Sequence, residues 1–221
     1  MNSIISYIEK FALVSLEKQE RLIRRLGDHI VELDLESGIA RFNAEIVFPF
    51  QVLGTESDNS LTWLWAWADE QPEVSDDLLR SARDVKAWGA REGVAEFTIP
   101  SLDLNRADGI MLSLIASEIC SASGYYRDAY DGGTLFILLH GADGGQPLEF
   151  DRTGIVRAMK DLASRYDIDQ RKALTSYFSM KSLPFSDSGD TLNAELAGGD
   201  RLVARFDPAG RMITMNGEPL S

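Results

Sequence analysis

The chain has 221 residues, of which 44% are hydrophobic and 26% charged, and its formal net charge at pH 7 is −13. These values are ordinary for a globular protein that buries a sizeable core. No apolar run approaches the roughly 20 residues of a membrane helix, and the first residues lack the basic start and unbroken apolar stretch of a signal peptide. The sequence therefore predicts a cytoplasmic protein with no membrane partner, and its single cysteine, Cys120, fits a reducing compartment.

The negative charge is concentrated in the first part of the chain. Residues 151–221 hold ten basic and ten acidic side chains, whereas residues 1–150 hold 12 basic and 25 acidic ones. The extreme is segment 28–77, with twelve acidic side chains and one basic one, Arg41. Such a surface repels phosphate backbones, so nucleic acid is not an expected partner, and it attracts a basic protein. The alternative interpretation is that the acidity only keeps the protein soluble.

Residues 3–26 carry apolar side chains at helical spacing and predict an amphipathic helix, which a glycine ends. The polar face offers two acid–base pairs at i,i+4 spacing, Glu17 with Arg21 and Glu20 with Arg24.

After this helix the apolar period changes from 3.6 to two, which is typical of strands. Four strands are predicted, over residues 29–35, 39–42, 45–54 and 61–68. Short turns join them, so they form an antiparallel meander. Pro49 lies inside the third strand and has no N–H group, which predicts an edge strand or a β-bulge there.

The fourth of these strands reads T-W-L-W-A-W-A from Thr62, so Trp63, Trp65 and Trp67 share one of its faces. Three exposed indoles would leave an apolar patch of roughly 600 Å², the limit of what soluble monomers show. The favoured interpretation is an interior strand, with the alanine face covered by a helix. A contact with a partner, a homodimer built on this strand and a ligand-stacking platform are the alternatives.

The following elements alternate between helix and strand. They are a helix over 75–93 with Ser75 as its N-cap, a strand over 95–99, a helix over 104–123 and a central strand over 134–139. A Gly-rich stretch over 140–147 is the predicted domain boundary. Beyond it the sequence predicts helices over 153–166 and 169–180 and strands over 191–196, 202–207 and 212–215.

Three motifs resemble a family of uncharacterised bacterial proteins: Q-V-L-G-T from Gln51, T-W-L-W-A-W-A from Thr62 and Y-R-D-A-Y-D-G-G-T-L-F from Tyr126. The resemblance covers roughly residues 25–140 and leaves 150–221 outside. It implies a shared α+β domain and carries over no catalytic residue.

One motif imitates an enzyme. F-I-L-L-H-G-A-D-G-G from Phe136 is similar to the strand and turn that precede the oxyanion hole of α/β-hydrolases. That class also needs a G-x-S-x-G motif and a later histidine, and the chain has neither after His140. We therefore do not expect a hydrolase, and the function is expected to be non-catalytic.

No metal site or cofactor is predicted, because two histidines and one cysteine cannot build a histidine-rich or thiolate centre. An oxygen-rich cation site of Asp128, Asp131, His140 and Asp143 is the alternative to a role of these aspartates in turns. Cys120 is expected in the core, and Glu118 on the same helix is expected to face outward.

The predicted fold is α+β, an antiparallel β-meander packed by helices over residues 1–145. A helical and β-hairpin extension over 150–221 either docks on the same sheet or folds separately. The leading hypothesis for function is an interaction or binding protein, of an immunity or inhibitor type, that uses acidic, aromatic-rich strands against a basic partner. The predicted binding residues are Trp63, Trp65, Trp67, Tyr126, Tyr130 and His140. The alternatives are a small-ligand-binding protein or an enzyme with a pocket near Tyr125, Tyr126, Tyr130 and His140, or the homodimer.

Overall fold

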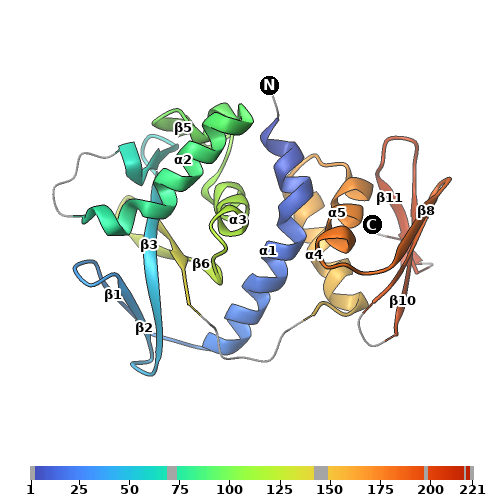
Figure 1. Ribbon diagram of the computed structural model, residues 1–221, viewed down its shortest axis with the longest axis horizontal. Coiled ribbons are helices and arrows are strands. Elements are labelled where there is room, and N and C mark those ends of the chain that lie inside the picture. Colours follow the sequence, from blue (N-terminus) through green and yellow to red (C-terminus); the bar gives the residue numbers. More distant parts are fainter. Residues whose placement is uncertain (1–2, 69–73, 142–148, 197–198, 217, 220–221) are drawn as a thin grey trace. The chain divides into compact units, whose positions relative to one another are not determined.

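The elements of the chain divide between two units in the computed structural model, which describes residues 3–68, 74–141, 149–196, 199–216 and 218–219 (Figure 1). The first unit contains Lys18–Gln146. The second contains Ser3–Glu17 together with Pro147–Ser221, so helix α1 (Ile4–Leu26) contributes its first part to one unit and its last part to the other.

The first unit is built on a seven-stranded sheet in which every pairing is antiparallel. Its strands are β1 (Val31–Asp34), β2 (Ile39–Phe42), β3 (Ile46–Ser57), β4 (Thr62–Trp65), β5 (Ser101–Asp103), β6 (Gly124–Tyr130) and β7 (Gly133–Leu139). The order β1-β2-β3-β4-β5 confirms the predicted meander, and β7 pairs with both β3 and β6.

Strand β3 organises this sheet because it has partners on both edges. Its first half pairs with β2 and its second half with β4, while β7 runs along the other edge. The register shifts between Val52 and Gly54, so the strand carries the predicted bulge, although three residues beyond Pro49. Gly54 is required there, because a Cβ atom would lie 2.4 Å from the ring of Trp63.

Helices cover both faces of the sheet. The elements are the end of α1, the short η1 (Ala66–Ala68), η2 (Asp76–Leu79) and η3 (Ala95–Phe97), and the helices α2 (Arg80–Glu92) and α3 (Gly109–Ile119). One core cluster combines Phe50 and Ile137 of the sheet with Leu22 of α1 and Leu79. On the other face α3 is almost entirely buried, and Phe136 would contact any side chain added at Gly109.

Two sequence predictions in this unit are wrong, and one strand was missed. Residues 95–97 form the 3-10 helix η3, and the strand comes later as β5. The helix predicted over 104–123 begins only at Gly109, because the Asp108 carboxylate caps it by accepting from Met111 N at 2.7 Å. Strand β6 was not predicted, since its polar sequence G-Y-Y-R-D-A-Y resembles a turn.

The second unit combines the first part of α1 with two helices and a five-stranded antiparallel sheet. Its further elements are α4 (Arg152–Arg165), α5 (Gln170–Met180), β8 (Phe185–Ser188), β9 (Thr191–Glu195), β10 (Arg201–Phe206), β11 (Met212–Met215) and β12 (Glu218–Pro219). The strands follow sequence order from β8 to β12, again a meander. Buried and exposed residues alternate strictly along β10, which gives the sheet one interior face.

A buried carboxylate on α1 holds this second unit together. Glu17 Oε2 accepts hydrogen bonds from Tyr177 Oη at 2.5 Å and from Phe150 N at 2.9 Å, and Oε1 lies 2.7 Å from Lys181 Nζ. The predicted Glu17–Arg21 pair is therefore wrong, because the Glu17 side chain is buried and has these partners instead. Burial and the Glu17 carboxylate raise the pKa of Tyr177, which keeps its hydroxyl proton available to donate.

The predicted α+β class is confirmed, since both units pack helices on antiparallel sheets. Within the described residues, no helix combines the length and the apolar character that crossing a membrane requires.

Candidate functional site

Trp63 and Trp65 lie in the interior of the first unit. Both side chains have an exposed fraction of 0%, and β4 is paired on both edges, with β3 and β5. Their rings meet edge to face with centroids 5.2 Å apart. These two indoles are therefore shielded from water, as expected of an interior strand, and they present no exposed surface to a partner or a second copy of the chain.

An aromatic row extends from this pair in both directions. The ring of Trp63 contacts the ring of Phe136, with 5.2 Å between centroids. On the other side, Phe97 lies between Trp65 and Trp88, at centroid distances of 5.7 Å and 5.6 Å. Trp65 Nε1 donates to the carbonyl oxygen of Glu96 at 2.9 Å. The row joins β7, β4, η3 and α2, so the tryptophans stabilise the fold.

Trp67 does not share the face of the other two, and this part of the sequence prediction is wrong. Strand β4 ends at Trp65, the residue opposite Gly54 of β3, and the next three residues form η1. Trp67 lies on η1, where its ring is partly buried and Lys86 Nζ is 3.7 Å from the ring centroid.

The predicted pocket of three tyrosines and a histidine does not form as one site. Tyr130 lies at the turn end of the β6–β7 hairpin and His140 follows the opposite end. Tyr125 and Tyr126 point to opposite faces of β6. Tyr126 contacts His29, with 3.2 Å between its hydroxyl and Nε2, and burial raises the pKa of Tyr126.

His140 contacts Ser81 of α2, which raises the question whether the histidine activates this serine as a nucleophile. His140 Nε2 lies 3.2 Å from Ser81 Oγ. A histidine activates a serine only if it accepts the hydroxyl proton. Here Ser81 Oγ donates that proton to Gln51 Oε1, which also accepts from Ser81 N at 2.7 Å. His140 therefore donates to the serine oxygen, and the cluster orients side chains without activating Ser81.

The charges around this cluster support the same conclusion. Burial lowers the pKa of His140, and Arg80 lowers it further, so the ring is neutral at pH 7. Cys120 Sγ donates to the carbonyl oxygen of Ser81 at 3.6 Å, and burial raises the pKa of the thiol to about 11. Because only a thiolate is a strong nucleophile, Cys120 is unreactive at neutral pH.

The oxygen-rich cation site has no support among the described residues. Asp128 lies in β6 and Asp131 in the turn that follows, at the far end of the hairpin from His140. Asp143 lies outside the described residues. Across the described ranges, no cluster of histidine, cysteine and carboxylate side chains is placed to hold a metal ion.

Glu118 does not face outward as predicted. Its side chain is 9% exposed and pairs with Lys18 Nζ of α1 at 2.7 Å. The surroundings of α3 explain this, because the helix is buried on nearly all sides and a carboxylate on it needs a cation.

Exposed acidic chemistry gathers around the β1–β2 hairpin, a region that we call the acidic hairpin surface. Its five exposed carboxylates are those of Asp28, Glu32, Asp34, Glu36 and Glu45. None of the five forms an ion pair with a residue that the structure describes. The basic residue of this surface is Arg41, which lies opposite Glu32 in the pairing of β1 with β2.

Three apolar side chains are exposed among these carboxylates. The exposed fractions are 77% for Ile30, 44% for Leu35 and 45% for Val47. Val47 is paired with Arg41 in the register of β2 and β3, on the outward face of the hairpin. The sequence prediction missed these three as surface residues, because alternation shows which residues share a face and not which face is covered.

The fold and this surface define an α+β protein whose interior is aromatic and whose exposed chemistry is acidic with apolar residues between the charges. The chain belongs to the family of unknown function DUF6882, whose model matches residues 5–142. The resemblance to an uncharacterised family is thus confirmed, and residues 143–221 lie outside the match. No curated protein and no solved structure matches the chain.

Proposed function

We propose that this protein is a non-catalytic binding module whose acidic hairpin surface docks onto a basic segment of another protein. The observation that carries the proposal is the group of five exposed carboxylates, which form no ion pair with a described residue and have one nearby base, Arg41, interleaved with exposed Ile30, Leu35 and Val47. Unpaired charges of one sign steer an oppositely charged partner and speed its association. Apolar side chains between them supply area that is buried on docking.

The chemistry around the surface supports this function over catalysis. Ser81 and Cys120 are not activated, and Trp63 and Trp65 are structural. The binding role predicted for the tryptophans is therefore assigned in this proposal to aliphatic residues of the same acidic segment, 28–77. A protein that masks a cationic site, such as an inhibitor or an immunity protein, uses chemistry of this kind, and nucleic acid is disfavoured by the same charges.

The proposal is tested with a labelled synthetic peptide of repeated Lys-Lys-Leu units, measured by fluorescence anisotropy at low and high salt. The triple variant Glu32→Gln/Glu36→Gln/Glu45→Gln is expected to bind it at least roughly tenfold more weakly, and salt is expected to weaken binding to the unaltered protein. Val47→Thr, which keeps the shape and all charges, is expected to weaken binding by a smaller factor.

A matched control removes the same charge elsewhere. Asp167→Asn/Glu195→Gln/Asp200→Asn neutralises three exposed carboxylates of the second unit. This variant is expected to bind the peptide like the unaltered protein. Equal loss in both triple variants would mean that only the net charge matters, which is the solubility interpretation, and it would overturn the proposal.

A further inference from the structure

The first unit contains a cavity of about 140 Å³ beneath the tip of the β1–β2 hairpin. Its floor is one cross-strand row of the sheet, in which Thr55 of β3 is paired with Leu64 of β4 on one side and Leu135 of β7 on the other. Its lining also includes Leu35 of the hairpin, Trp65, Ala66 of η1 and Leu79 of η2.

The hairpin turn cannot move further toward η2, because the two are already in close contact. Gly38 closes that turn with φ +69°, and a Cβ atom on it would lie 2.7 Å from Leu78 Cδ2. Its carbonyl oxygen accepts from Phe50 N at 2.8 Å, which ties the turn to β3. The cavity beside Leu35 is therefore a feature of this fold, because these two contacts fix the position of the hairpin turn.

We propose that this cavity is a binding site for a small, uncharged monocyclic aromatic molecule. The lining carries no charged side chain, so an ionised ligand would lose its hydration without a counter-charge. An apolar cavity of about 150 Å³ is known to bind benzene, so the volume here fits a single ring with at most a small substituent. Thr55 supplies the hydroxyl of the lining. The proposal does not depend on the basic partner, since its ligand carries no charge.

The test is a titration of the full chain with toluene, followed by NMR of the leucine and valine methyl groups. Saturable shifts are expected for Leu35, Val52, Leu64, Leu79 and Leu135, which line the cavity, and not for methyl groups of the second unit. Benzoate, the same ring with a charge, is expected to leave these methyl groups unchanged. Shifts scattered over both units, no saturable shift, or equal binding of benzoate would each overturn the proposal.

Two cavity-filling variants and one control make the location decisive. Ala66→Leu places a larger side chain in the lining and is expected to weaken toluene binding at least about tenfold, whereas Ala66→Val fills less space and has a smaller effect. Ala129→Leu adds the same atoms at an exposed position of β6 and is expected to bind like the unaltered protein. If the leucine variant does not fold, toluene binding is measured on the valine variant instead. Unchanged toluene binding in a folded Ala66 variant would overturn the proposed location of the site.

Discussion

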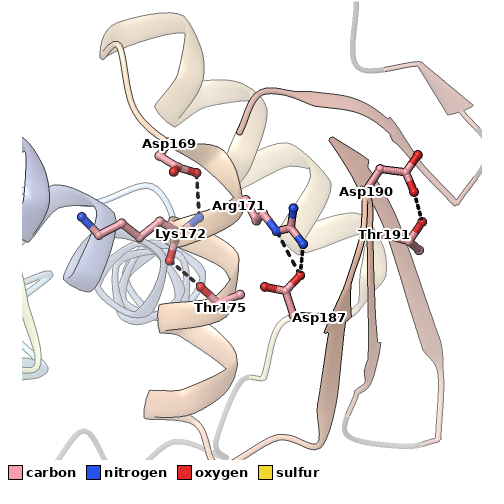
Figure 2. A network of polar contacts seen from close by, with 7 residues as sticks. All are labelled: Asp169, Arg171, Lys172, Thr175, Asp187, Asp190 and Thr191. Carbon is pink, nitrogen blue, oxygen red and sulfur yellow. Dashed lines mark hydrogen bonds and ion pairs between the residues drawn. The ribbon is translucent and has the colours of Figure 1, made fainter. Parts of the chain in front are cut away.

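The acidic hairpin surface of the first unit and the polar network of the second contain the same kind of side chain in opposite situations. In the second unit four carboxylates each have an arginine beside them, in the pairs Asp161–Arg165, Asp187–Arg171, Asp190–Arg205 and Asp207–Arg211. Figure 2 shows Arg171 of α5 directed at Asp187 of β8. The five carboxylates of the hairpin form no ion pair with a described residue, and Arg41, opposite Glu32 in the register, is the one basic residue of segment 28–77.

This difference shows where the net charge of −13 is available to a partner. Carboxylates paired within their own unit contribute little field at a distance, because each is offset by a cation a few ångströms away. Unpaired carboxylates keep their field. The excess of acidic residues in the first part of the sequence is thus exposed on one surface. In residues 151–221, where acids and bases are equal in number, many of them form local ion pairs.

The largest expected effect lies at the deepest carboxylate of the second unit. Glu17→Ala leaves Tyr177, Lys181 and the Phe150 N–H without their acceptor in a buried place, so we expect a loss of about 3 kcal/mol in the stability of this unit. Hydrogen exchange of the α5 amides measures it, because all four tryptophans lie in Lys18–Gln146 and report on the other unit.

The control for this prediction is Glu36→Ala on the acidic hairpin surface. An exposed carboxylate without a partner should cost less than about 0.5 kcal/mol when removed. If the two variants lose similar stability, the contrast between paired and unpaired carboxylates does not hold.

The next effect concerns Glu56, a half-buried carboxylate of the first unit that accepts from Gly109 N at 2.6 Å. Burial raises the pKa of Glu56 above the ordinary value of 4.5. The folded protein therefore holds the proton more tightly than the unfolded chain, so stability falls as pH rises from about 4.5 through the raised pKa.

At neutral pH that penalty is fully present, and Glu56→Gln removes it while keeping an acceptor for Gly109. We expect a gain of less than about 1 kcal/mol, since solvent screens a half-exposed group. Chemical denaturation at pH 7 and near pH 4 measures it, and a gain that does not shrink at the lower pH would contradict the stated cause.

A smaller effect is expected when the hairpin carboxylates are neutralised. In Glu32→Gln/Glu36→Gln/Glu45→Gln like charges no longer repel one another, so Tm should rise slightly at low salt and the difference should vanish at high salt. Thermal unfolding followed by tryptophan emission measures this unit. A fall in Tm would show that these carboxylates have stabilising contacts.

Periodicity and turn residues were sufficient for most of the architecture. Amphipathic spacing predicts the helices α1, α4 and α5 and the first hairpin, and tertiary contacts reinforce these elements. Strand β6 could not be predicted in this way, because its stability comes from pairing with the apolar β7.

The candidate site was predicted less well than the fold. The acidic segment could be read from the sequence, but Trp63 and Trp65 are buried and the exposed apolar residues are Ile30, Leu35 and Val47. Local spacing cannot distinguish these cases, because which face of a strand is covered depends on helices far away in the sequence, here α2 and α3. The cavity has the same origin, since its lining comes from the β1–β2 turn, three strands, η1, η2 and the residue Val74.

The smallest expected effect is a salt-dependent change in the pKa of one aspartate from each region, because the two pKa values are lowered by different causes. The pKa of Asp190 is lowered by the hydrogen bond from Arg205 and then by Thr191, whereas that of Asp34 is lowered by the side chain and backbone of Ser37. Salt of about 1 M screens an exposed ion pair but not a short hydrogen bond to a neutral donor. We therefore expect salt to move the pKa of Asp190 back toward 3.8 and to leave that of Asp34 nearly unchanged, as measured by carboxyl NMR titration. Ser37→Ala should raise the pKa of Asp34 at both salt concentrations. An equal response of the two aspartates to salt would mean that the charge of Arg41, and not the hydrogen bonds from Ser37, chiefly lowers the pKa of Asp34, and the hairpin would then resemble the second unit.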